Sequence, residues 1–119
     1  MTSYARAWLT AFFLTVAVEI AVATPLLARS RASWPRRAGI VAVSNLASHP
    51  IVWFVLPGLA LTASERLVAS EAWAVAIEAA TYFLVWPALG STRAFGTSAL
   101  ANGASLGAGL VLRALGVRV

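Results

Sequence analysis

Long apolar runs alternate with short segments that contain arginine, proline or glycine along the whole chain. A run of about 20 apolar residues is the length that an α-helix needs to cross about 30 Å of hydrocarbon. Within each run, apolar and polar residues do not alternate as they would in the strands of a membrane barrel. The sequence therefore predicts an all-α fold, a membrane-spanning four-helix bundle with up-down-up-down topology. Residues 1–119 are expected to form a single integral membrane domain, with helices at approximately 8–27, 38–56, 67–89 and 97–115.

Proline, glycine and capping residues predict local features of these helices. Pro50 lies inside the second run and has no N–H, so the carbonyl of Leu46 loses its helical partner and a kink is expected. Pro57-Gly58 ends that run or bends it. Ser64 is expected to cap the third helix, with Glu65 in its first turn.

Composition places the chain in a lipid bilayer. Hydrophobic residues make up 61% of the sequence and charged residues 11%, whereas soluble domains have about 45–50% and about 25%. The net charge of +5 does not indicate nucleic-acid binding, because the arginines fall between apolar runs instead of forming one polar face. The chain has no cysteine, which excludes a disulfide or a thiolate metal site.

Arginines near the helix ends predict the orientation in the membrane. Positively charged loops tend to stay in the cytoplasm, so we expect the first loop there and both termini outside, in a multi-pass protein of the inner (plasma) membrane. A cleaved signal peptide is the alternative for the first run, but that run continues past the cleavage-like Ala21-Val22-Ala23 and is followed by four arginines. The first-loop side holds Arg29, Arg31, Arg36, Arg37 and Arg93, and the opposite side holds Arg6, Arg66, Arg113 and Arg118.

A polar side chain occurs near the middle of each run, at a similar depth. With a rise of about 1.5 Å per residue, these positions fall within a slab about 7 Å thick. A charged side chain at the bilayer centre costs about 2.5–3.5 kcal/mol on insertion scales. We therefore expect the polar side chains to face inward and to meet in a candidate ion-binding cluster. Its members are Glu19, Asn45, His49, Glu78 and Asn102.

Two carboxylates, an imidazole and two amides are compatible with more than one chemistry. They could bind a hard or borderline divalent cation, or they could relay protons. An intramembrane metalloenzyme is a weaker alternative, because no H-E-x-x-H or E-x-x-H motif is present, and whether a metal is bound stays open. A purely structural alternative is that the polar residues only hydrogen-bond the helices together, at about 0.6 kcal/mol per interaction.

The fourth run is rich in small residues, among them Gly103 and Gly107 at the spacing that lets helix backbones approach closely. Packing of these glycines inside the bundle is favoured over dimerisation. A second pattern is that the first and third runs both hold a central glutamate, whereas the second and fourth both hold an early asparagine. This arrangement hints at duplication of a two-helix unit.

The order of these polar residues resembles that of a group of small bacterial four-helix integral membrane proteins with no established activity. The resemblance implies a fold and a location in the bacterial inner membrane, and it assigns no catalytic or binding role to any residue. It is carried by Glu19, Asn45-x-x-x-His49-Pro50, Glu71-x6-Glu78-x3-Tyr82 and Ala101-Asn102-x-x-Ser105.

The first functional hypothesis is therefore an ion- or proton-handling membrane protein, or a subunit of one. The alternative is a non-catalytic scaffold or accessory subunit whose polar core only fixes helix packing. An enzyme is not favoured, and the sequence assigns no catalytic residue and no cofactor. The expected partners are the lipid bilayer and either further copies of the chain or a larger membrane complex, and not nucleic acid.

Overall fold

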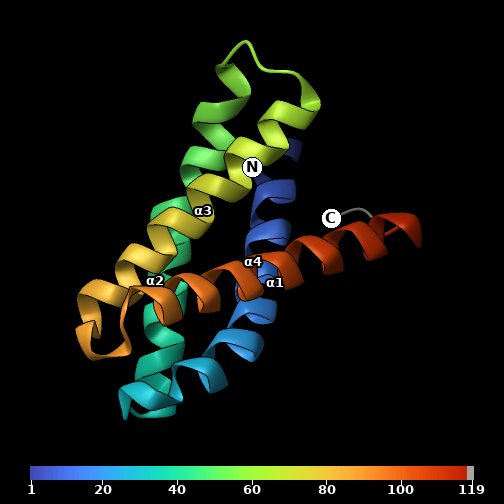
Figure 1. Cartoon of the computed structure of the whole chain (residues 1–119). Coiled ribbons are helices and arrows are strands. Elements are labelled where there is room, and N and C mark those ends of the chain that lie inside the picture. Colours follow the sequence, from blue (N-terminus) through green and yellow to red (C-terminus); the bar gives the residue numbers. More distant parts are fainter. Residues whose placement is uncertain (118–119) are drawn as a thin grey trace.

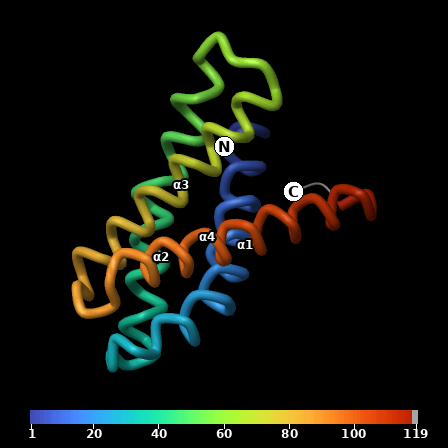
Figure 2. The backbone as a smooth tube through the Cα atoms, viewed as in Figure 1, coloured from blue at the N-terminus to red at the C-terminus, as the bar shows by residue number. Residues whose placement is uncertain are grey.

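The computed structural model describes residues 1–117, and over these residues the chain forms four long α-helices (Figures 1 and 2). Each is long and apolar enough to cross a membrane. The predicted all-α, antiparallel bundle is therefore confirmed. Arg118, which entered the expected charge balance, lies outside the described residues. The helices are α1 Ser3–Leu26, α2 Trp34–Pro50, α3 Ala63–Val85 and α4 Ser91–Ala114, and the short helical segments are η1 Leu27–Ser30, η2 Ile51–Val55, η3 Leu56–Gly58 and η4 Pro87–Leu89.

Each helix begins four to six residues before the start that the apolar pattern indicates, and polar residues cap the first turn of α1 and of α3. At the start of α1 the Thr2 side chain accepts a hydrogen bond from Ala5 N. Ser64 is not the cap of α3, contrary to the expectation. Thr62 is the cap instead, since its hydroxyl accepts from the backbone of Glu65 and the Glu65 carboxylate accepts from Thr62 N in return. The chain enters α4 through Gly90 at φ +76°, a conformation that favours glycine.

The second membrane span continues beyond Pro50 with a different helical geometry. Pro50 has no N–H for the carbonyl one turn earlier, and the wider π-helical turn η2 begins at the next residue. η3 follows, so the span extends from Trp34 to Gly58. This change of helical pitch rotates the residues after Pro50 relative to those before it.

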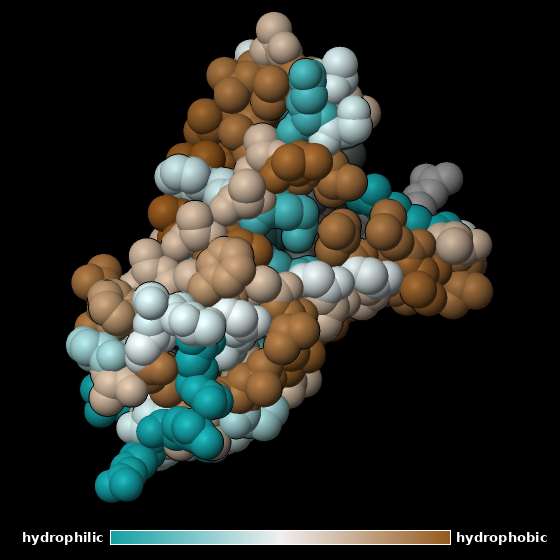
Figure 3. All heavy atoms as spheres, in the orientation of Figure 1, coloured by the Kyte–Doolittle hydropathy of each residue, from teal (hydrophilic) through white to brown (hydrophobic). Residues whose placement is uncertain are grey.

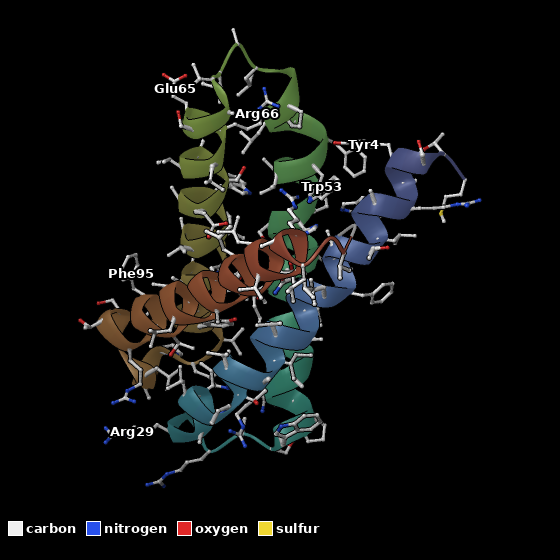
Figure 4. The ribbon with its side chains drawn as sticks, turned by 90° about the vertical axis from the view of Figure 1, so that its right-hand side faces the viewer. Tyr4, Arg29, Trp53, Glu65, Arg66 and Phe95 are labelled. Carbon is white, nitrogen blue, oxygen red and sulfur yellow. The ribbon has the colours of Figure 1, made fainter. Side chains whose placement is uncertain are left out.

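The helices pack in a closed ring at one end of the bundle and separate at the other. α1 and α3 each contact both α2 and α4. Figures 1 and 4 both show the C-terminal part of α4 turning away from the N-terminal part of α3. Buried apolar residues fill the end near η1 and η4, where the helices stay together. They are Ala23, Leu27, Val41, Tyr82, Trp86, Leu89, Ala94 and Ala101.

The outer surface is largely apolar, as Figure 3 shows for one face. Large side chains such as Phe13, Val68 and Leu84 are exposed there, as expected for contact with lipid. Gly103 and Gly107 do not make the close packing expected inside the bundle, because a Cβ atom built at either would meet no atom within 4 Å. At these two positions the surface of α4 has no close neighbour within residues 1–117.

Candidate functional site

Two carboxyl groups meet in the interior of the bundle. Glu19 of α1 and Glu78 of α3 are both 0% exposed, and their carboxyl groups are near neighbours in the bundle. α1 and α3 pack mainly on α2 and α4, so these long side chains reach each other across the middle of the ring. We call Glu19 and Glu78 the carboxyl pair.

Glu19 receives hydrogen bonds from both neighbouring helices. Asn45 of α2 donates from Nδ2 to Glu19 Oε2 at 2.6 Å, and Ser105 of α4 donates from Oγ to Oε1 at 3.1 Å. Both donors are neutral. They satisfy the carboxylate oxygens without supplying the positive charge that would compensate a buried negative one.

Glu78 is bonded in the same way from the same two helices. Asn102 of α4 donates from Nδ2 to Glu78 Oε2 at 2.7 Å, and Ser48 of α2 donates from Oγ to Oε1 at 3.3 Å. α2 and α4 therefore each supply one amide and one hydroxyl to the carboxyl pair. The six residues Glu19, Asn45, Ser48, Glu78, Asn102 and Ser105 form what we call the polar network.

The two asparagine side chains are fixed by their own helices. Asn45 Nδ2 also donates to Val41 O at 3.1 Å, and Asn102 Nδ2 donates to Ser98 O at 3.0 Å, in each case one helical turn back. Asn45 differs in one respect: its Oδ1 is buried and has no hydrogen-bond partner within residues 1–117. An unsatisfied buried acceptor costs about 1–3 kcal/mol, so a donor brought to this atom would relieve that cost.

The polar network has an internal two-fold pattern. Exchanging the α1–α2 hairpin with the α3–α4 hairpin converts the Asn45–Glu19 bond into Asn102–Glu78, and the bond from Ser48 into the bond from Ser105. Each hairpin crosses the membrane twice, so both have the same orientation and the relating axis runs along the membrane normal. The carboxyl pair lies where that axis passes.

The sequence carries the same repeat, beyond the glutamate and asparagine that hinted at it. Val16-Ala17-Val18-Glu19 corresponds to Val75-Ala76-Ile77-Glu78. Residues 36–48 and 93–105 align without a gap and share arginine, glycine, alanine, asparagine, alanine and serine at equivalent positions. Aligning the second and fourth runs on their asparagines pairs Ser48 with Ser105, the two network members that the predicted cluster did not include. The identical pairs are Arg36 and Arg93, Gly39 and Gly96, Ala42 and Ala99, Asn45 and Asn102, Ala47 and Ala104, and Ser48 and Ser105.

His49, which was expected in the same cluster, lines the same cavity as Glu78 but makes its hydrogen bond elsewhere. Its Nδ1 accepts a hydrogen bond from Trp8 Nε1 at 3.1 Å, and its ring packs against Phe12 and Trp53. With Nδ1 as acceptor, a neutral imidazole carries its proton on Nε2. The equivalent residue in the second repeat is Leu106, so His49 stands outside the repeated pattern.

A cavity of about 620 Å³ lies over the polar network. Its inner end is formed by Asn45, Glu78, Asn102 and other network residues. Its outer end lies where α3 begins and α4 ends, and Figure 3 shows hydrophilic atoms in the hollow there. Tyr4 and Trp53, which point toward each other in Figure 4, line one side of it. The apolar residues that fill the bundle near η1 and η4 lie at the opposite end, so the network is reached from one side.

The chemistry available at this site is that of oxygen ligands. Carboxylate, amide and hydroxyl oxygens suit protons, ammonium groups and hard cations. Within residues 1–117 no three or more His, Cys, Asp or Glu side chains are grouped as a metal site would require.

No protein family, curated protein or solved structure matches the chain. The group of small bacterial membrane proteins that the sequence resembles is thus not identified by a match. Only the general features of that resemblance are confirmed: residues 1–117 contain four apolar helices that are long enough to cross a membrane.

Proposed function

We propose that the protein is an ion- or proton-handling membrane protein, or a subunit of one, in which Glu19 and Glu78 hold an exchangeable proton or cation. The observation that carries this proposal is the contact between two fully buried carboxyl groups whose donors are all neutral. Glutamines would make comparable hydrogen bonds without the cost of a buried charge. Two ionisable groups at this depth are therefore better explained by charge exchange than by helix packing.

The nearness of the two carboxyl groups supports a shared proton. Two ionised carboxylates repel at such a distance, whereas one proton between them supplies a donor and leaves a single negative charge. A cation with one positive charge can replace that proton without changing the net charge of the site. The polar network would then bind one or the other.

Access from one side also favours binding over simple structural support. The cavity reaches Glu78 and both asparagines, near the depth at which membrane transporters place their substrate and ion sites. We further propose that the protein lies in the bacterial inner membrane with its first loop in the cytoplasm and its termini outside. The cavity would then open to the outside.

A role within an assembly is part of this proposal, as a homo-oligomer or in a larger membrane complex, because a chain of 119 residues can enclose only a short path. The competing function is a scaffold or accessory subunit. It is favoured by the hydrogen bonds with which the polar network links α2 and α4 to both α1 and α3. Under that alternative the carboxyl pair would never change its protonation.

Proton release on cation addition separates the two functions. Purified protein in weakly buffered detergent solution, with a pH-indicating dye, should release protons when NaCl or KCl is added in place of choline chloride. Glu78→Gln should abolish the release. Glu65→Gln is the matched control, because Glu65 is exposed on the same helix and glutamine can keep its capping role. Equal release from wild type and Glu78→Gln, or none from wild type at any pH, would contradict the proposal.

A further inference from the structure

We infer that the cavity over the carboxyl pair binds an organic amine, with its ammonium group at the polar network and its apolar body along the cavity wall. This inference rests on the proposed function, since the amine would take the place of the exchangeable proton. It adds the chemical class of the ligand, which the carboxyl pair alone does not define.

The cavity is larger than a bare ion needs. A volume of about 620 Å³ lies within the range of about 300–1,000 Å³ that is typical of small-molecule sites. Such sites are lined mainly by apolar side chains and hold a few polar groups that converge at one place. Here the polar groups converge at the inner end, and apolar residues form much of the wall.

The inner end requires a ligand that donates hydrogen bonds. Asn45 is 1% exposed and lines the cavity, and its Nδ2 is already bonded to Glu19 and to Val41 O. Its Oδ1 is the acceptor without a partner. Glu78, beside it on the cavity floor, accepts only from neutral donors. A primary ammonium group supplies the positive charge that is missing beside Glu78 and an N–H donor for Asn45 Oδ1.

The wall suits an apolar or aromatic body. Trp53 lies on one side, Leu106 and Leu110 lie on the other, and Glu71 stands between the floor and the mouth. Glu71 is seven residues before Glu78 on α3, so it lies about 10 Å closer to the mouth on the same face. A cation that enters the cavity would pass this carboxylate before it reaches the floor.

Two arginines lie at the mouth of the cavity, far from its floor. Arg66 precedes Glu78 by twelve residues, and Arg113 follows Asn102 by eleven, so both lie about 16–18 Å from the floor along their helices. A small monoamine bound at the floor would end well below them. A ligand with only an anionic group would instead stay at the mouth, far from the donors and acceptors of the polar network.

Binding would exchange one positive charge for another. The carboxyl pair with its single shared proton carries a charge of −1. When the ammonium binds, that proton leaves to solvent, and two carboxylates with one ammonium again give −1. The net charge buried in the bundle stays constant, and the ammonium pairs with both carboxylates, which offsets the cost of burying the additional ionised groups. The expected stoichiometry is one proton released per amine bound.

Calorimetry on the full chain in detergent, with a dye in parallel samples to count released protons, tests this directly. Benzylamine should bind and release about one proton per molecule. Benzyltrimethylammonium, which has the same charge and ring but no N–H, should bind about tenfold or more weakly. Phenylacetate should not compete. Equal affinity for the two cations would overturn the requirement for N–H donors, and displacement of benzylamine by phenylacetate would overturn the site itself.

Two variants separate this inference from the proposed function. Leu106→Trp narrows the cavity from its wall, so it should weaken benzylamine binding far more than it weakens the release of protons by the smaller sodium or potassium ions. Glu78→Gln should abolish both. If the wild type exchanges protons for inorganic cations but does not bind benzylamine, the inference is wrong and the proposed function stands. If Leu106→Trp binds benzylamine as the wild type does, the amine is not in this cavity.

Discussion

Asn45 Nδ2 lies 2.6 Å from Glu19 Oε2 on the neighbouring helix, and the same contact recurs between Asn102 and Glu78 at 2.7 Å in the second hairpin. Each asparagine is anchored to its own helix by a bond to the carbonyl one turn back. Each hairpin thus brings a carboxyl group and its amide donor together, and the union of two hairpins brings the carboxyl groups into contact.

The two asparagines should be equivalent in stability. Asn45→Leu and Asn102→Leu each remove the amide donor of a buried carboxyl group, so each should lower the free energy of unfolding by about 1–3 kcal/mol. The two losses should agree to within about 1 kcal/mol, because the repeated contacts are the same. Unfolding in mixed detergent micelles measures both. Ser64→Ala is the control, since Ser64 is exposed and does not cap α3.

A large difference between the two asparagine variants would show that the Asn–Glu contacts of the two hairpins contribute unequally to the free energy of unfolding. The unpartnered Oδ1 of Asn45 gives the expected sign of any small difference. Removing Asn45 also removes an unsatisfied acceptor, so Asn45→Leu should be the less damaging change. A result in which Asn102→Leu is harmless would contradict the geometry of the network.

The bond between Trp8 and His49 should decide the form of the imidazole. Trp8→Phe keeps an aromatic ring but removes the donor to His49 Nδ1, and it should cost about 0.5–1.5 kcal/mol. Nitrogen-15 NMR of the single histidine should show the Nε2–H tautomer in the wild type and a mixture in Trp8→Phe. The wild type with its proton on Nδ1 would rule out the observed contact.

Neighbouring positions on α4 should differ sharply in their tolerance of bulk. Gly103 is exposed and has open space around it, whereas Ala101 is fully buried in the apolar cluster near η1 and η4. Gly103→Leu should change the free energy of unfolding by less than about 0.5 kcal/mol, and Ala101→Leu should lower it by about 1–3 kcal/mol. Thermal unfolding in detergent compares them. If Gly103→Leu is damaging, a second copy or a partner packs against that face.

Depth in the membrane could be predicted from the sequence because it depends on one constant. The rise per residue of an α-helix is fixed, so the distance of a side chain from the helix end follows from counting. Counting residues was enough to predict a similar membrane depth for Glu19, Asn45, Glu78 and Asn102. In the structure, hydrogen bonds join Asn45 to Glu19 and Asn102 to Glu78. The length and apolarity of the spans followed from the runs themselves.

The direction of a side chain around its helix was harder to predict, because it depends on how each helix is rotated and tilted against its neighbours. His49 shares a helix face with Asn45, yet it meets Trp8 and Phe12 instead of the carboxyl pair. Gly103, one residue after Asn102, points away from the bundle. The cavity also escaped prediction, since it exists where α4 diverges from α3 and no local pattern records that divergence.

Infrared spectroscopy of the carboxyl groups tests the central claim most directly. The wild type in detergent should show the C=O band of a protonated carboxyl group in a dry environment, and the band should disappear as the shared proton is exchanged for a cation. Glu19→Gln and Glu78→Gln should each fold and each remove this exchange, while Glu65→Gln should retain it. A band that is the same in the wild type and in the Glu19→Gln/Glu78→Gln double variant would contradict the account, because the carboxyl pair would then hold no exchangeable proton.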